Sequence, residues 1–208
     1  GLASSTAVVG TMLDHVNQRP ESASYAVAAI LLANAAMATR NLAIAVGFTA
    51  GGSTGILLEA IIPLGVVIVL AFAVAALTAD WSESGPMDLK SPFSLRNALG
   101  FGVVFLGVLV FGSLAETWFG TLGFYATAVA SGFVSSAGAT TSAVVLYRGG
   151  QLGGPEATIA ILLATVSSIV VKALLASTST NTGFRNRVAA YSAILLIGGA
   201  LASVLVVV

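Results

Sequence analysis

Hydroxyl-bearing residues form two matching clusters within otherwise apolar sequence. The clusters are Ser4, Ser5 and Thr6, and then Ser135, Ser136, Thr140 and Thr141. If a helix breaks at such a cluster inside a membrane, the freed backbone groups and hydroxyls can coordinate a partly dehydrated ion. The structural alternative is close helix packing, in which each hydroxyl bonds back to its own helix. Both readings stay open, and we treat these residues as candidate lining of an ion or solute path.

Two basic residues, Arg40 and Lys172, stand inside long apolar segments. A charge in hydrocarbon costs about 2.5 to 3.5 kcal/mol on insertion scales and usually faces the bundle interior. Either side chain could instead reach the lipid headgroups, and Lys172 lies nearer the end of its segment. The functional reading is a pair of fixed positive charges that draws anions or gates a cation path. Glu59 is a possible partner for Arg40, or a first-turn residue at a helix N-terminus.

Neutral polar residues add to the same two apolar segments. Asn34 lies in the segment of Arg40, and Thr165 and Ser168 lie in that of Lys172. These side chains could face the hydroxyl clusters. The predicted path therefore consists of Ser4, Ser5, Thr6, Asn34, Arg40, Ser135, Ser136, Thr140, Thr141, Thr165, Ser168 and Lys172.

The chain offers little for catalysis or metal binding. It has no cysteine and one histidine, His15, so neither thiolate chemistry nor a zinc site is expected. Hard cations prefer carboxylate oxygens, which the hydroxyl clusters lack. Its sequence has no nucleophile with a base, no phosphate-binding glycine loop and no carboxylate pair. We therefore expect no enzyme, no metal and no cofactor.

Composition identifies the solvent of this chain. Of its 208 residues 57% are hydrophobic and 8% are charged, against about 25% charged in a soluble domain. Such a chain cannot build a charged surface, so its partner is the lipid bilayer. Its net charge of zero gives no basic face for nucleic acid.

Uncharged runs predict the helices, since a membrane span needs about 20 apolar residues. Seven runs result, at 1–13, 25–48, 55–79, 95–115, 120–147, 157–177 and 188–208. The fold class is thus all-α, a polytopic transmembrane helical bundle. A polar linker at 80–94 separates residues 1–79, the end of one repeat, from 95–208, a second repeat of four spans.

An ungapped offset of 131 residues relates the two halves of the sequence and predicts an internal duplication. It places 1–5 (GLASS) on 132–136 (GFVSS) and 30–33 (ILLA) on 161–164 (ILLA), and we call it the repeat offset. Four spans separate Gly1 from Gly132, so the repeats should be parallel. The first helices of repeat one would then lie upstream of Gly1. Basic loop residues place Arg19 and Arg148 on one side, favoured as cytoplasmic, and Arg185 and Arg187 on the other.

Several blocks resemble, in order, the C-terminal membrane domain of MgtC/SapB-type proteins, which is domain of unknown function 4010. They are 1–7 (GLASSTA), 29–34 (AILLAN), 93–99 (FSLRNAL), 131–134 (SGFV), 160–164 (AILLA) and 171–173 (VKA). The resemblance covers nearly the whole chain. It implies a multi-pass protein of a prokaryotic plasma membrane, an MgtC-like domain upstream and a link with cation homeostasis.

The sequence thus predicts an ion or small-solute channel or transporter-like module. The alternative is a non-transporting assembly or regulatory subunit, whose Gly, Ser and Thr faces pack against partner helices. Its partners would be a second copy of the chain or the upstream MgtC-like domain.

Overall fold

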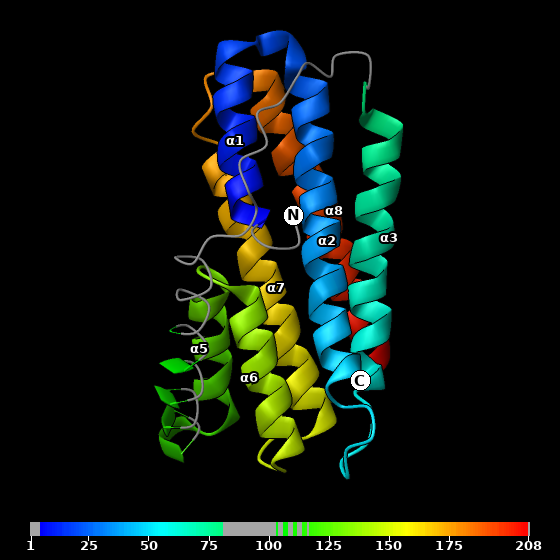
Figure 1. Ribbon diagram of the computed structural model, residues 1–208, viewed down its shortest axis with the longest axis vertical. Coiled ribbons are helices and arrows are strands. Elements are labelled where there is room, and N and C mark those ends of the chain that lie inside the picture. The colour runs from blue at the N-terminus through cyan, green and yellow to red at the C-terminus, as the bar shows by residue number, and fades with distance from the viewer. Residues whose placement is uncertain are drawn as a thin grey trace.

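The computed structural model describes residues 5–80 and 117–207, together with residues 103, 106–107, 110–111 and 114–115 (Figure 1). Regular structure in these residues is helical. The helices are α1 (Ser5–Gln18), α2 (Ala23–Gly47), α3 (Ile61–Thr78), α5 (Thr121–Gly132), α6 (Ser136–Arg148), α7 (Gly154–Ala176) and α8 (Thr182–Val207), with single 3-10 turns at Pro20–Ser22 and Leu58–Ala60.

Four helical segments are long and apolar enough to cross a membrane. They are Pro20–Gly47, Leu58–Thr78, Gly154–Ala176 and Thr182–Leu205. Large apolar side chains such as Leu77 and Leu205 point outward, 85% and 83% exposed, which suits a lipid environment. These helices indicate a membrane protein. The prediction of seven spans is not confirmed, and its span at 95–115 falls largely outside the described residues, as does most of the 80–94 linker.

Two predicted spans agree closely with observed helices. The runs 25–48 and 157–177 correspond to α2 and α7, whose ends differ from them by no more than three residues. The last helix begins earlier than predicted, at Thr182, because the side chain of Asn181 caps it by accepting the Phe184 N–H at 3.0 Å. The third begins later because Gly55, at φ 85°, lies in a turn.

The prediction of one span at 120–147 is wrong, because two half-length helices occupy it. Helix α5 ends at Gly132, and the chain turns back through Phe133 and Val134 into α6. Ser135 is extended and caps α6, its Oγ accepting the Gly138 N–H at 3.3 Å. Each helix is about 20 Å long at 1.5 Å per residue, too short for a hydrocarbon core of about 30 Å.

Gly132 explains where α5 can lie. A Cβ added at this position would come within 2.5 Å of the Ala164 carbonyl oxygen. Only glycine therefore allows α5 to approach α7 so closely.

Helices related by the repeat offset run in opposite directions. Figure 1 shows α1 rising from the middle of the bundle to one end, while α6 descends from the middle to the other. Hydrogen bonds fix both ends. Ser179, after α7, donates to Asn17 of α1 at 3.0 Å, and Tyr147 of α6 donates to the Thr54 carbonyl, after α2, at 2.6 Å. The ends of α1 and α7 thus meet at one end of the bundle, and those of α2 and α6 at the other.

The predicted parallel relation of the halves is therefore wrong, because the observed relation is inverted. The repeat offset aligns the starts of α2 and α7, since it places Ala23 on Gly154, and it places the first described residue of α1, Ser5, on the first residue of α6, Ser136. The parallel prediction counted 120–147 as one crossing, whereas the turn at 133–135 reverses the chain at the start of the second copy. The duplication itself stays a prediction.

The predicted sidedness of the basic loops is also wrong. Asn181 donates to the Pro20 carbonyl at 3.3 Å, and Arg187 donates to Ser24 at 2.8 Å. Arg19 and Arg187 therefore lie at the same end of the bundle. Arg148 lies at the other end, beside Gly52. The inverted relation of the helices accounts for this reversal.

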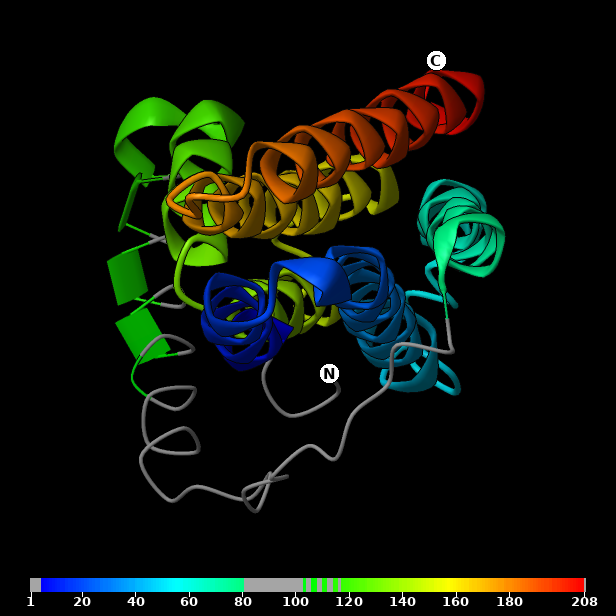
Figure 2. The same ribbon diagram turned by 90° about the horizontal axis from the view of Figure 1, so that it is seen from above.

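Helix α7 is the centre of the bundle. Seen from above, it lies between α8 on one side and the α1–α2 pair on the other (Figure 2). Apolar clusters pack at its two ends, one including Ala157 and Ile161 and the other Ile169 and Ala176. Polar residues of α7 and α2 lie between and beside these clusters, and the candidate site is built from them.

Candidate functional site

Lys172 is buried in the middle of a polar layer between α2 and α7. Its side chain is 0% exposed, and its Nζ donates to Asn34 Oδ1 at 2.8 Å and contacts Met37 Sδ at 3.0 Å. These contacts join α7 to α2. The lysine thus points into the bundle, and the alternative of an interfacial anchor does not describe it.

Arg40 connects the same layer to the start of α6. Its Nη2 donates to Ser136 Oγ at 3.5 Å. Ser136 is 2% exposed and is the first residue of α6. Arg40 and Lys172 also lie close enough for their charges to interact. The structure therefore brings together both predicted basic residues and one of the predicted hydroxyls.

Asn41 is a site residue that sequence reasoning missed. It is fully buried, and its Nδ2 donates to Thr165 Oγ1 at 3.0 Å, a second link between α2 and α7. The Thr165 hydroxyl in turn donates to the Ile161 carbonyl at 2.8 Å. A usable signal was present, because the repeat offset places Asn41 on Lys172.

The two links between α2 and α7 are counterparts of each other. The repeat offset places Asn34 on Thr165 and Asn41 on Lys172, so it converts the Asn34–Lys172 pair into the Thr165–Asn41 pair. Two helices that run in opposite directions and exchange their contacts in this way are related by a local pseudo-twofold axis. That axis passes between α2 and α7, through the polar layer.

Each of the two links between α2 and α7 carries one polar atom without a partner. Asn34 Nδ2 and Asn41 Oδ1 are buried and have no hydrogen-bond partner among the described residues. A buried amide group left unpaired costs about 1 to 3 kcal/mol. Such atoms are expected where a ligand or water completes the hydrogen bonding.

The first turn of α6 adds backbone donors. The first N–H groups of any α-helix have no intrahelical acceptor. Ser135 caps the N–H of Gly138, which leaves those of Ser136 and Ala137, two buried residues. Aligned peptide dipoles also make this end of the helix positive.

Some of the remaining predicted residues have a structural role, and for the others the structure gives only the burial of the side chain. Thr140 and Thr141 donate to the carbonyls of Ser136 and Ala137 at 2.8 and 2.9 Å, as the packing alternative requires. Ser5 and Ser168 are buried and Thr6 is exposed. Ser4 lies outside the described residues.

Glu59 lies at the start of α7, and its predicted pairing with Arg40 stays a prediction. A Cβ added at Gly154 would be 2.9 Å from Glu59 Oε1, which places this carboxylate at the start of α7. Glu59 also precedes α3 directly. The carboxylate therefore faces two helix N-termini, where negative charge is favourable.

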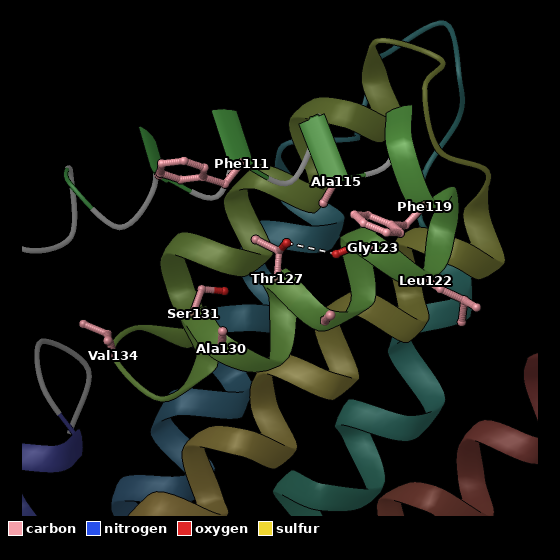
Figure 3. Close-up of a pocket in the computed structure, with 11 residues that line it drawn as sticks. Phe111, Ala115, Phe119, Leu122, Gly123, Thr127, Ala130, Ser131 and Val134 are labelled. Carbon is pink, nitrogen blue, oxygen red and sulfur yellow. Dashed lines mark hydrogen bonds between the residues drawn. The ribbon is translucent and has the colours of Figure 1, made fainter.

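A separate apolar groove runs along α5 (Figure 3). Its volume is about 850 Å³, and residues such as Phe111, Phe119 and Leu122 line it. The two hydroxyls among its described lining residues are already used, since Thr127 donates to the Gly123 carbonyl and Ser131 to that of Ala128. In the described residues the groove thus offers apolar surface and no free hydroxyl proton, unlike the polar layer.

Comparisons with known proteins follow the chain over most of its length. A family model described as "Domain of unknown function (DUF4010)" matches residues 1–180. An uncharacterized protein of Aquifex aeolicus (strain VF5) is 33% identical over 90 residues, which are 43% of this chain and 39% of that protein. The match thus spans well under two thirds of that relative's length. No solved structure matches the chain significantly.

Proposed function

The chain belongs to the DUF4010 family, and we propose that it moves an ion or small polar solute across a membrane. The path runs through the polar layer between α2, α6 and α7. The observation that carries this proposal is the pair of exchanged hydrogen bonds, Asn34–Lys172 and Asn41–Thr165, on a pseudo-twofold axis between oppositely directed helices.

Inverted halves suit transport for a physical reason. Halves with the same interactions in opposite directions can exchange conformations, so that a central site opens to each side in turn. Helix α6 and the described part of α1 both begin near the middle of the bundle. Such starts bring helix N-termini to a depth where the lipid offers no hydrogen bonds. An origin of the halves by duplication is part of this proposal.

The position of the polar faces favours transport over the assembly alternative. A module that packs against partner helices would need its small and polar residues on the outside. Ser5, Ser136, Thr140 and Thr165 are instead buried within this chain. We place the protein in a prokaryotic plasma membrane as a transporter rather than an enzyme. A second copy or an upstream MgtC-like domain remains a proposed partner.

Reconstitution into liposomes tests the proposal. Uptake of a panel of labelled anions, cations and neutral solutes is compared between protein-containing and protein-free vesicles. We expect at least one solute to enter faster with the protein. Arg40→Ala and Ser136→Ala should each slow it by about tenfold, because the first removes a half-buried charge of the polar layer and the second removes the hydroxyl that this charge contacts.

Thr141→Val is the matched control, because the Thr141 hydroxyl bonds only to its own helix. This variant should transport like the wild type. Transport of no solute in the panel would contradict the proposal, as would unchanged flux in both Arg40→Ala and Ser136→Ala.

A further inference from the structure

We infer that the polar layer binds a small oxyanion, at a site between Arg40, Lys172, Asn34 and the first turn of α6. This inference deepens the proposed function, on which it rests, by naming the class of solute.

Charge is the first argument. Lys172 is fully buried and makes its hydrogen bonds to Asn34 and Met37, and no carboxylate contacts it among the described residues. Arg40, which is also positive, lies close enough for its charge to act on Lys172. Two like charges in a medium of low dielectric repel each other strongly. An anion between them turns this repulsion into attraction.

Hydrogen-bond donors are the second argument. Asn34 Nδ2 is a buried donor without an acceptor in the described part of the chain. The amide nitrogens of Ser136 and Ala137 are helix-end donors at buried residues, next to Arg40. Asn34 thus lies beside Lys172 and the first turn of α6 beside Arg40, and an acceptor-rich ligand between the two basic groups would use donors from both helices.

The shape of the donors favours an oxyanion over a halide. A guanidinium presents a planar fork of N–H groups that matches two oxygens of a carboxylate, phosphate or sulfate. A halide has one centre and cannot use that fork fully.

Anion-dependent thermal stability of the detergent-solubilised full chain tests the inference without requiring transport. Sodium salts of phosphate, sulfate, hydrogen carbonate and acetate are titrated at constant ionic strength, with chloride and gluconate for comparison. We expect at least one small oxyanion to raise Tm in a saturable manner, because a ligand that binds the folded state stabilises it.

Three variants locate the binding site. Lys172→Met keeps the length of the side chain without its charge, and Arg40→Gln keeps some hydrogen bonding. Each should weaken the apparent affinity for the oxyanion about tenfold or more. Arg185→Gln removes an exposed cation at the end of the bundle and should leave the affinity unchanged.

The outcomes test the anion site and the proposed transport separately. A saturable oxyanion effect that Lys172→Met and Arg40→Gln both weaken supports the site. No saturable effect in the wild type, an effect of chloride alone, or equal affinity in all three variants overturns it. If binding holds while liposome uptake fails, the proposed transport is wrong and the anion site stands. If uptake of a cation or neutral solute is found without oxyanion binding, transport stands and the anion site is wrong.

Discussion

Lys172 donates a 2.8 Å hydrogen bond to Asn34 inside the bundle, and the repeat offset turns this pair into Asn41 and Thr165, which are also bonded. The two contacts have different chemistry, one with an ammonium group and one with neutral groups. Their equivalent placement therefore reflects the arrangement of α2 and α7 rather than similarity of side chains. It is the clearest sign of an inverted relation between the halves.

A double-mutant cycle on Asn34 and Lys172 should give a large coupling. Lys172→Met leaves Asn34 Oδ1 unpaired and Asn34→Leu leaves the ammonium unpaired, so each single change destabilises the protein. The double variant replaces both partners by apolar groups and should recover most of the loss. We expect a coupling of about 1.5 to 3 kcal/mol, measured by denaturation in detergent.

Thr140→Val provides the control for that cycle. The Thr140 hydroxyl bonds to the Ser136 carbonyl in its own helix, so it should show no coupling with Lys172→Met. Additive losses for Asn34→Leu and Lys172→Met would mean that the buried bond contributes nothing to stability.

Two substitutions of Ser135 distinguish its structural role, as the cap of α6, from its effect on oxyanion binding. Ser135→Ala removes the cap of α6 and should cost about 1 kcal/mol of stability. Ser135→Asp retains a capping oxygen and should be close to the wild type in stability without ligand. Its negative charge beside Ser136 and Arg40 should nevertheless weaken oxyanion binding. Equal oxyanion affinities for Ser135→Asp and the wild type would place the anion elsewhere.

Gly132 should tolerate no side chain. In Gly132→Ala the new Cβ meets the Ala164 carbonyl oxygen at 2.5 Å, so α5 must move away from α7. We expect a loss of about 1 to 3 kcal/mol. Gly10→Ala is the matched control, because nothing lies within 4 Å of its added Cβ and alanine favours a helix by about 0.5 to 1 kcal/mol. A Gly132→Ala variant as stable as Gly10→Ala would contradict the close approach of α5 and α7.

The orientation of the helices can be checked by labelling. The chain contains no cysteine, so single substitutions report unambiguously. Arg19→Cys and Arg187→Cys should react with a membrane-impermeant thiol reagent from the same side of a sealed vesicle. Arg148→Cys should react from the other side. Labelling of Arg19→Cys and Arg148→Cys from one side would restore the sequence-based sidedness and contradict the inverted arrangement.

Sequence alone predicted the helical membrane class and the positions of α2 and α7, because uncharged runs report directly on lipid exposure. It also singled out five polar residues of the site, because polar side chains are unexpected in such apolar runs. They are Asn34, Arg40, Ser136, Thr165 and Lys172. The direction of α6 could not be predicted in the same way. Residues 120–147 are uniformly uncharged, and hydropathy does not distinguish a crossing from a hairpin that turns back at Phe133–Ser135. Asn41 was missed although the repeat offset places it on Lys172, because an asparagine beside Arg40 attracts little attention until the structure shows Thr165 opposite it.

The accessibility of Ser136 tests the central claim most directly. In an otherwise cysteine-free protein, Ser136→Cys should react with a small membrane-impermeant thiol reagent from either side of the membrane, because a central transport site opens to each side in turn. A saturating oxyanion should slow this reaction. Reaction from neither side, in a variant that folds, would show the polar layer to be a dry packing contact and would contradict the account.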